Sequence, residues 1–186
     1  MRVLTTLLFS ALLLPARPQT APMDGPRRLV IAEDIALPMS STQVEQAVRK
    51  AWPFSFGLEP GAGPLPAEAV NGRFEADARF NFRSTATNSR LQSLGVVNYH
   101  ISIRAGNGQC KVLISQFDHT GNRNAPGGAV NLGPLYAGER PPDRIPGISM
   151  GTATRLHKDM RDQVSDHLQK VLKAFAAQLR KAASPE

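Results

Sequence analysis

Residues 73–83 alternate between polar and apolar side chains without a break, and this pattern restricts the chain to a small set of folds. The apolar members share one side: Phe74, Ala76, Ala78, Phe80 and Phe82. Arginines, carboxylates and an asparagine occupy the other side. A period of two with one apolar and one polar side is typical of a strand in an antiparallel sheet whose second face meets water. The segment therefore predicts a strand that needs a cover on one face only.

Further strands are expected on both sides of this segment. Residues 28–36 form an apolar-rich run, and residues 95–104 alternate as residues 73–83 do. Ala105-Gly-Asn-Gly108 favours a hairpin turn, with a return strand over residues 109–118. The return strand alternates less regularly, because apolar residues occur on both of its sides.

A short helix is expected between the first two strands. Its apolar stripe consists of Val44, Ala47, Val48 and Ala51. Thr42 with Glu45 three residues later matches a capping box. Ser40 with Gln43 is an alternative register for the same helix start. Pro53 ends the helix, because proline disfavours helical geometry at the residue before it.

Three aromatic residues gather around Pro53, namely Trp52, Phe54 and Phe56. A patch of this kind could bind a ligand, but aromatic side chains bury a large area and more often fill a core. We therefore expect them to plug the space between the first helix and the sheet.

The chain closes with a long amphipathic helix, predicted over residues 152–181. Its apolar residues recur at spacings of three and four: Leu156, Met160, Val164, Leu168, Val171, Leu172, Phe175 and Leu179. At ~1.5 Å per residue it would span roughly 45 Å, enough to cross a whole sheet. The expected fold class is therefore α+β: an antiparallel sheet of about five strands, with one short and one long C-terminal helix packed on one face.

The N-terminal residues predict export. Arg2 precedes an apolar run that Pro15 ends, which is the pattern of a secretory signal and is too short to span a bilayer. We expect residues 1–21 to be the signal peptide and processed region, and residues 22–27 a flexible lead-in. The mature protein would be periplasmic or secreted, with no stable membrane anchor after cleavage and no nucleic acid as a partner.

Residues 28–182 are expected to form a single domain, in which residues 119–151 form a long loop rich in Gly and Pro. Two interpretations of this loop remain open: a mobile surface excursion, or a covering flap. Cys110 is the only cysteine, so an intramolecular disulfide is excluded, and its apolar setting predicts a buried side chain.

The net charge of +7 comes from basic residues spread along the chain and favours anionic surfaces only weakly.

The order of these elements resembles a known family. The first helix closes on Trp52, a glycine leads the strand at Gly72-Arg-Phe74, and a tyrosine occurs in the strand Asn98-Tyr-His-Ile-Ser-Ile103. A hairpin glycine and the long last helix complete the likeness. Over residues 28–180 the chain resembles the exported bacterial proteins grouped as domain of unknown function 4468. The resemblance implies a TBP-like fold, and because the family has no established activity, it implies no catalytic residue.

Motifs for cofactor and metal chemistry are incomplete. Gly128-Ala-Val-Asn-Leu-Gly133 has the glycine spacing of a P-loop, but Pro134 follows where a lysine is required. The four histidines, His100, His119, His157 and His167, lack the spacing that places two ligands on one helix face. His119 is expected in an exposed turn. We predict no cofactor and no metal.

Gly147-Ile-Ser149-Met-Gly151 has the letters of a hydrolase nucleophile elbow. A Pro-rich loop precedes it where the elbow needs a strand, and too few residues follow for the remaining triad. We therefore interpret Ser149 or Thr152 as the N-cap of the last helix and predict no catalytic residue. A serine hydrolase of the envelope that uses Ser149 remains one alternative function.

The polar sides of the predicted strands carry the candidate binding residues. If these strands are neighbours, Arg79, Arg83, His100 and Arg104 form a polar recognition surface. The leading hypothesis is a non-enzymatic domain that binds an unidentified protein or ligand of the cell envelope, or has a structural role there. The main alternative is a carrier of apolar ligands, with a cavity between sheet and helix lined by the following residues: Phe80, Met160 and Phe175.

Overall fold

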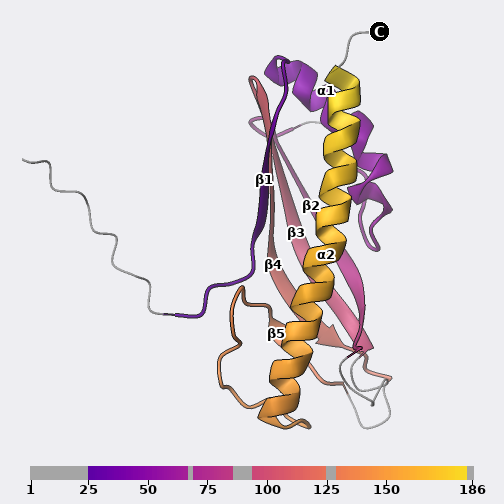
Figure 1. Cartoon of the computed structure of the whole chain (residues 1–186). Coiled ribbons are helices and arrows are strands. Elements are labelled where there is room, and N and C mark those ends of the chain that lie inside the picture. The colour runs from indigo at the N-terminus through magenta and orange to yellow at the C-terminus, as the bar shows by residue number, and fades with distance from the viewer. Residues whose placement is uncertain (1–24, 67–68, 86–93, 125–128, 184–186) are drawn as a thin grey trace, which may run out of the picture.

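The computed structural model describes residues 25–66, 69–85, 94–124 and 129–183. The proposed signal lies outside these residues. The sheet contains β1 (Ile31–Ala36), β2 (Arg73–Arg83), β3 (Leu94–Gly106), β4 (Gln109–Gly121) and the short β5 (Gly133–Pro134). The strands are antiparallel in the order β1-β4-β3-β2, and β5 pairs with the end of β4. The helices α1 (Ser41–Ala51) and α2 (Met150–Ala183) lie on one side of this sheet (Figure 1). The expected α+β class is confirmed.

The start of α1 follows the second of the two registers considered. Ser40 is the N-cap, and its side chain and that of Gln43 form a complete capping box. Thr42 lies within the helix, so the first register is wrong. At the other end Pro53 does not stop helical structure altogether, because it occupies an early position of the short 3-10 helix η1 (Trp52–Phe54), where an N–H is not needed.

The aromatic plug is confirmed for two of the three aromatic residues. Trp52 and Phe56 are buried, and the Phe56 ring, in the 3-10 helix η2 (Phe56–Leu58), lies 5.3 Å from the ring of Phe175 on α2. Phe54 was expected beside them but is 63% exposed. The break between the two 3-10 helices turns Phe54 outward while its neighbours face the core.

The apolar stripe of α2 covers the apolar side of the sheet along the strands (Figure 1). Of the predicted stripe only Val171 is half-buried, and the other members are buried with Phe74 and Phe82 of β2. Burying a large apolar side chain contributes about 1.5–3 kcal/mol. The helix is therefore the cover that the alternation of β2 requires.

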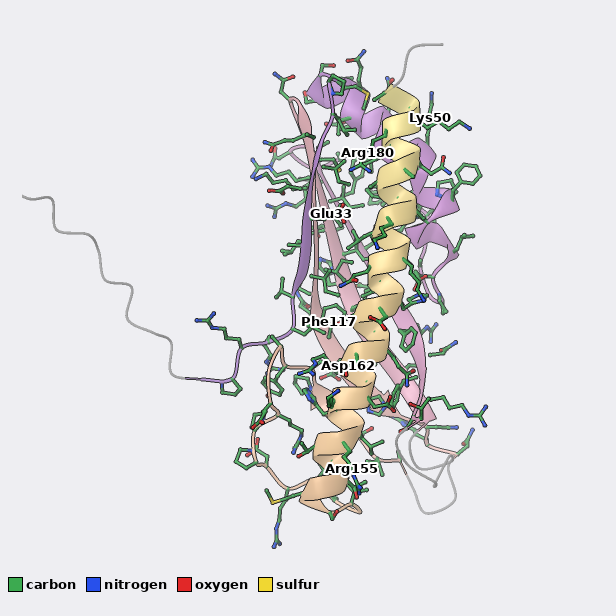
Figure 2. All side chains as sticks on the ribbon, in the orientation of Figure 1. Glu33, Lys50, Phe117, Arg155, Asp162 and Arg180 are labelled. Carbon is green, nitrogen blue, oxygen red and sulfur yellow. The ribbon has the colours of Figure 1, made fainter. Side chains whose placement is uncertain are left out.

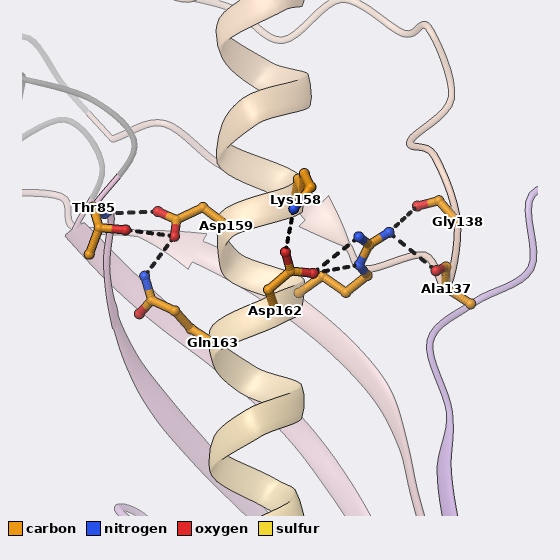
Figure 3. A network of polar contacts seen from close by, with 8 residues as sticks. Thr85, Ala137, Gly138, Lys158, Asp159, Asp162 and Gln163 are labelled. Atoms are coloured by element: carbon orange, nitrogen blue, oxygen red, sulfur yellow. Dashed lines mark hydrogen bonds and ion pairs between the residues drawn. The ribbon is translucent and has the colours of Figure 1, made fainter.

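Polar contacts fix the first half of α2 to segments on its two sides (Figure 3). On one side Asp159 accepts hydrogen bonds from the backbone N–H and the hydroxyl of Thr85, just after β2, at 2.8 and 2.9 Å. On the other side Arg161 donates to the carbonyls of Ala137 and Gly138 at 3.2 and 3.0 Å. These contacts set the position of the helix along the sheet.

The irregular alternation of the return strand has a simple cause. Side chains of β4 face the core at Cys110, Val112 and Ile114, and then at Phe117 and His119. The core-facing positions therefore change once, from even-numbered to odd-numbered residues. The pairing of β3 with β4 shifts register at this place, and Gln116 has a φ of 57°. A β-bulge inserts one extra residue and so reverses the facing of all residues beyond it.

Residues 119–151 are less loop-like than the sequence predicted. Residues 119–121 extend β4, and the chain then returns to pair with β4 through β5. Its apolar residues Val130, Leu132, Leu135 and Ile145 are buried. The described part of this segment therefore covers the core, which was the second of the two interpretations.

Within the described part of the chain, neither helix is long and apolar enough to span a bilayer.

Gly121 is a sensitive point of this covering segment. A Cβ there would collide with the backbone of Val130, whose nitrogen would lie only 2.8 Å away. We expect Gly121→Ala to lower the free energy of unfolding by about 1–3 kcal/mol, because the covering segment must move away from β4. Gly138→Ala is the matched control, since no atom lies within 4 Å of its added Cβ. Equal urea unfolding midpoints for the two variants would contradict this account.

Candidate functional site

One side of the sheet is covered by neither of the two described α-helices, and we call its side chains the polar face (Figure 2). Because side chains alternate along a strand, these residues interleave with the buried ones. The polar face includes Asp34, Arg73, Glu75, Asp77, Arg79, Asn81, Arg83, Asn98, His100, Ser102, Arg104, Lys111, Leu113 and Gln116. It combines charges of both signs with an uncovered surface.

His100 lies at the centre of the polar face and is held by two carboxylates. Its Nδ1 lies 2.8 Å from Asp77 and its Nε2 lies 2.7 Å from Glu75. The hydrogen bond with Asp77 raises the pKa of His100 above its ordinary value; burial opposes this rise and Glu75 adds to it. Ser102 also donates to Glu75, at 3.0 Å. These contacts tie β2 to β3 and make His100 a fixed part of the surface.

A pocket of about 320 Å³ opens beside His100. Arg79, Asn98 and Gln116 line it with His100, so charged and amide groups converge there. The β-bulge brings Gln116 to this place, in a left-handed backbone conformation that is uncommon for residues other than glycine. Gly61 lines the pocket as well, and a Cβ there would come within 2.7 Å of the Arg79 Nε.

A second pocket, of about 470 Å³, opens at the other end of β2. Arg73, Glu75 and Arg104 supply its charged groups. Its remaining lining is Pro66, Val70 and Asn71. The two pockets are separated by the pairs that hold His100.

The four residues predicted as a recognition surface share the polar side but do not form one cluster. Arg79 and His100 line the first pocket, and Arg104 lines the second. Arg104 lies opposite Arg73, which is six positions from Arg79 along β2, or about 20 Å at ~3.3 Å per residue. Arg83 lies at the far end of β2 and lines neither pocket. The four residues thus lie at three places along the polar side of the sheet, and their joint role in recognition stays a prediction.

Asn98 and Gln116 line the first pocket but were not among the predicted site residues. Asn98 was recognised only as a polar strand residue. The signal for Gln116 was the broken alternation of the return strand, which marks a bulge.

A buried polar contact beneath the polar face was also missed. Glu59 is buried, and its carboxylate accepts from the Tyr99 hydroxyl at 2.8 Å and contacts His167 Nε2 at 2.8 Å. Burial, together with the carboxylate of Glu59, raises the pKa of Tyr99 above its ordinary value. The three groups connect the segment after η2, β3 and α2, so they stabilise the fold.

Two further histidines are buried, and His119 corrects the expected exposed turn. His119 lies within β4, and its Nδ1 accepts from the backbone N–H of Leu132 at 3.2 Å. His157 on α2 accepts through Nε2 from the backbone N–H of Tyr136 at 3.0 Å. Burial lowers the pKa of both histidines to about 4, and nearby Arg161 and Arg140 contribute at His157. Both rings are therefore neutral acceptors that hold the covering segment.

Ser149 is used as a helix cap. Its hydroxyl lies 2.9 Å from the Thr152 hydroxyl and accepts from the Thr152 backbone N–H at 3.2 Å.

Cys110 is buried as expected, and burial raises the pKa of its thiol to about 12. No group of three or more potential metal ligands occurs among the residues that the structure describes.

The residues assigned to an apolar ligand cavity instead fill the space between sheet and helix. Met160 and Phe175 have no exposed surface. Phe80 packs on His167, with the ring centres 5.1 Å apart. Both pockets described above open on the opposite side of the sheet.

Comparison with solved structures identifies the fold. A TBP-like protein from Parabacteroides distasonis has a TM-score of 0.53 and 9% sequence identity, over 80% of this chain and 92% of that one. The chain has a TBP-like fold. A DUF4468 family protein from Bacteroides ovatus has a TM-score of 0.48 and 16% identity, over 80% and 86% of the two chains. No family model and no curated protein matches the sequence. The resemblance inferred from the sequence is confirmed as a likeness of fold.

The buried histidines predict a loss of stability in acid. Below pH 6.5 the unfolded chain takes up protons that the folded His119 and His157 do not accept until about pH 4. The free energy of unfolding therefore falls between these pH values, by on the order of 3 kcal/mol per histidine at the lower limit. Above pH 6.5 neither histidine contributes to the pH dependence.

Urea unfolding at pH 7.5 and pH 4.5 measures this effect. His119→Asn and His157→Gln place an amide oxygen near the accepting nitrogen of each ring and do not titrate. We expect the double variant to lose much less stability between the two pH values than the unmodified protein. An equal loss in both proteins would contradict the assignment.

Proposed function

We propose that this chain is a non-enzymatic binding domain of the bacterial cell envelope and that it binds its partner through the polar face. The observation that carries this proposal is the sheet face itself, which no helix of the described ranges covers and on which two pockets open (Figure 2). Ligand sites are concave and contain a few converging polar groups. The pocket beside Arg79 and Gln116 has this character.

The structural roles of the polar groups outside the polar face support the proposal that binding occurs on this face. Glu59, His119 and His157 are engaged in contacts that hold the fold together, and Ser149 caps a helix. The polar face, in contrast, keeps charged side chains in contact with water. Gln116 adds to this argument, because unusual backbone conformations cost of order 1–3 kcal/mol and are concentrated at functional sites.

The location in the envelope is supported by the N-terminal sequence. Arg2 and the apolar run that follows it have the order of a secretory signal. An exported binding domain would meet envelope proteins or ligands rather than nucleic acids. The TBP-like fold gives no reason to assume DNA binding, because function depends on sites and not on folds.

Site-specific crosslinking in the native cells tests the binding face. A photoreactive amino acid at Asn98 should yield a discrete adduct, whereas the same amino acid at the exposed Lys173 of α2 should not. Arg79→Ala combined with Arg104→Ala should abolish the Asn98 adduct without lowering the thermal unfolding midpoint. The proposal fails if no adduct forms at Asn98 or if the double variant forms it equally well.

Fractionation of the same cells tests the location. We expect the protein in the periplasmic or extracellular fraction, and N-terminal sequencing should find a cleavage point between Ala16 and Ala21. Removal of Arg2 and its apolar run should keep the protein in the cytoplasm. Recovery of the unprocessed full chain in the cytoplasmic fraction of unmodified cells would overturn the location.

A further inference from the structure

Three basic residues lie side by side across the polar face. The pairing places Arg73 of β2 opposite Arg104 of β3, and Arg104 opposite Lys111 of β4. Directly opposite side chains have Cβ atoms about 4.5–5.5 Å apart, and like charges at such positions are destabilising. The row therefore retains a repulsion that an anion placed between its members would relieve.

The acidic residues around this row neutralise it only in part. The Arg73 Nε lies 3.5 Å from Glu75, but that carboxylate also holds His100 at 2.7 Å and Ser102 at 3.0 Å. Lys111 lies 3.5 Å from Asp34, and these two side chains are 50% and 69% exposed. Exposed pairs of this kind contribute little. Arg104 has no hydrogen bond or ion pair with any residue of the described ranges, and it lines the pocket of about 470 Å³.

Part of the lining of this pocket is apolar and belongs to a closed turn. Val70 and Pro66 line it, and the Val70 side chain is 74% exposed. The turn at Asn71 and Gly72, whose φ values are 53° and 71°, brings Val70 back to Arg73. Two backbone hydrogen bonds of 3.1 and 3.0 Å close this turn. An exposed apolar residue on a hydrogen-bonded turn thus lines the same pocket as two arginines.

We propose that this pocket binds an amphiphile with one acid group, a single carboxylate or phosphate group attached to an apolar body. The acid group lies between Arg104 and Arg73, because guanidinium groups bind such oxygens with two parallel hydrogen bonds. The apolar body lies against Val70 and Pro66. The pocket volume is within the usual range for small-molecule sites. The inference rests on the proposed function, since the pocket opens on the polar face.

Glu75 defines the expected selectivity. Its carboxylate lines the same pocket, so a ligand with an acid group at each end brings one of them towards a like charge. A cationic amphiphile lacks the group that the two arginines bind. The site is therefore expected to prefer a ligand with one acid group over one with two acid groups or with an amine.

Titration calorimetry on the mature protein tests this preference with four defined probes: octanoate, suberate, acetate and octylammonium. We expect octanoate to bind at least about tenfold more tightly than each of the others. Octyl phosphate in a further titration distinguishes the two acid groups, and either acid on the octyl chain satisfies the proposal. Equal binding of acetate and octanoate, or no binding of either octyl acid, would overturn it.

Substitutions locate the site within the protein. Arg104→Gln should weaken octanoate binding about tenfold or more, and Val70→Asn should weaken octanoate while leaving acetate unchanged. Arg83→Gln is the matched control, because it removes the same charge from the polar side of β2 but lines neither pocket. Equal weakening by Arg83→Gln and Arg104→Gln would show a general effect of charge and would overturn the site.

The outcome separates this inference from the proposed function. If Asn98 crosslinks to a partner but octanoate and octyl phosphate do not bind, the ligand proposed for the pocket is wrong and the proposed binding face is supported. If octanoate binds and Arg104→Gln abolishes binding while no crosslink forms, the ligand proposed for the pocket is supported and the proposal of a macromolecular partner is wrong.

Discussion

The contact between α2 and the apolar side of the sheet is the interaction on which the rest of the structure depends. A sheet with one apolar and one polar side cannot be stable alone, because its apolar side would meet water. The stripe of α2 removes that side from water along the strands, and Phe175 and Leu168 have no exposed surface. Because both helices lie on this side, neither of them covers the opposite side of the sheet (Figure 1).

Covering one side also determines which polar groups can take part in binding. The carboxylate of Glu59 and the rings of His119 and His157 lie within or beside the covered side, where a polar group without a hydrogen bond is costly. Of these groups, the Nε2 of His119 has no partner among the described residues. Each accepts a hydrogen bond that connects separate parts of the chain. These groups would attract attention as candidate catalytic residues in a sequence, yet their hydrogen bonds serve the fold. The charged groups of the polar face, in contrast, remain accessible to water.

The sequence predicted most reliably what a long and regular period determines. The strand Arg73–Arg83 and the stripe of α2 follow from alternation and helical spacing, which need no knowledge of partners. The bulge at Gln116 is different, because a break in alternation shows that something changes but not which strand pairs across it. The expected exposed turn at His119 was wrong because β4 continues beyond its predicted end at Asp118, as far as Gly121. Contacts such as Glu59 with His167, 108 residues apart, leave no local pattern at all.

The arrangement of charge on the polar face follows from register rather than from composition. A net charge of +7 spread along the chain gives no reason to expect a focus of positive charge. Antiparallel pairing nevertheless aligns Arg73, Arg104 and Lys111, which are far apart or unremarkable in the sequence. One residue further along each strand the side chains point into the core, so a slip of one position would bury these charges. The register that places the apolar side chains under α2 therefore also aligns the row of basic side chains on the other side of the sheet. A change of register would alter both.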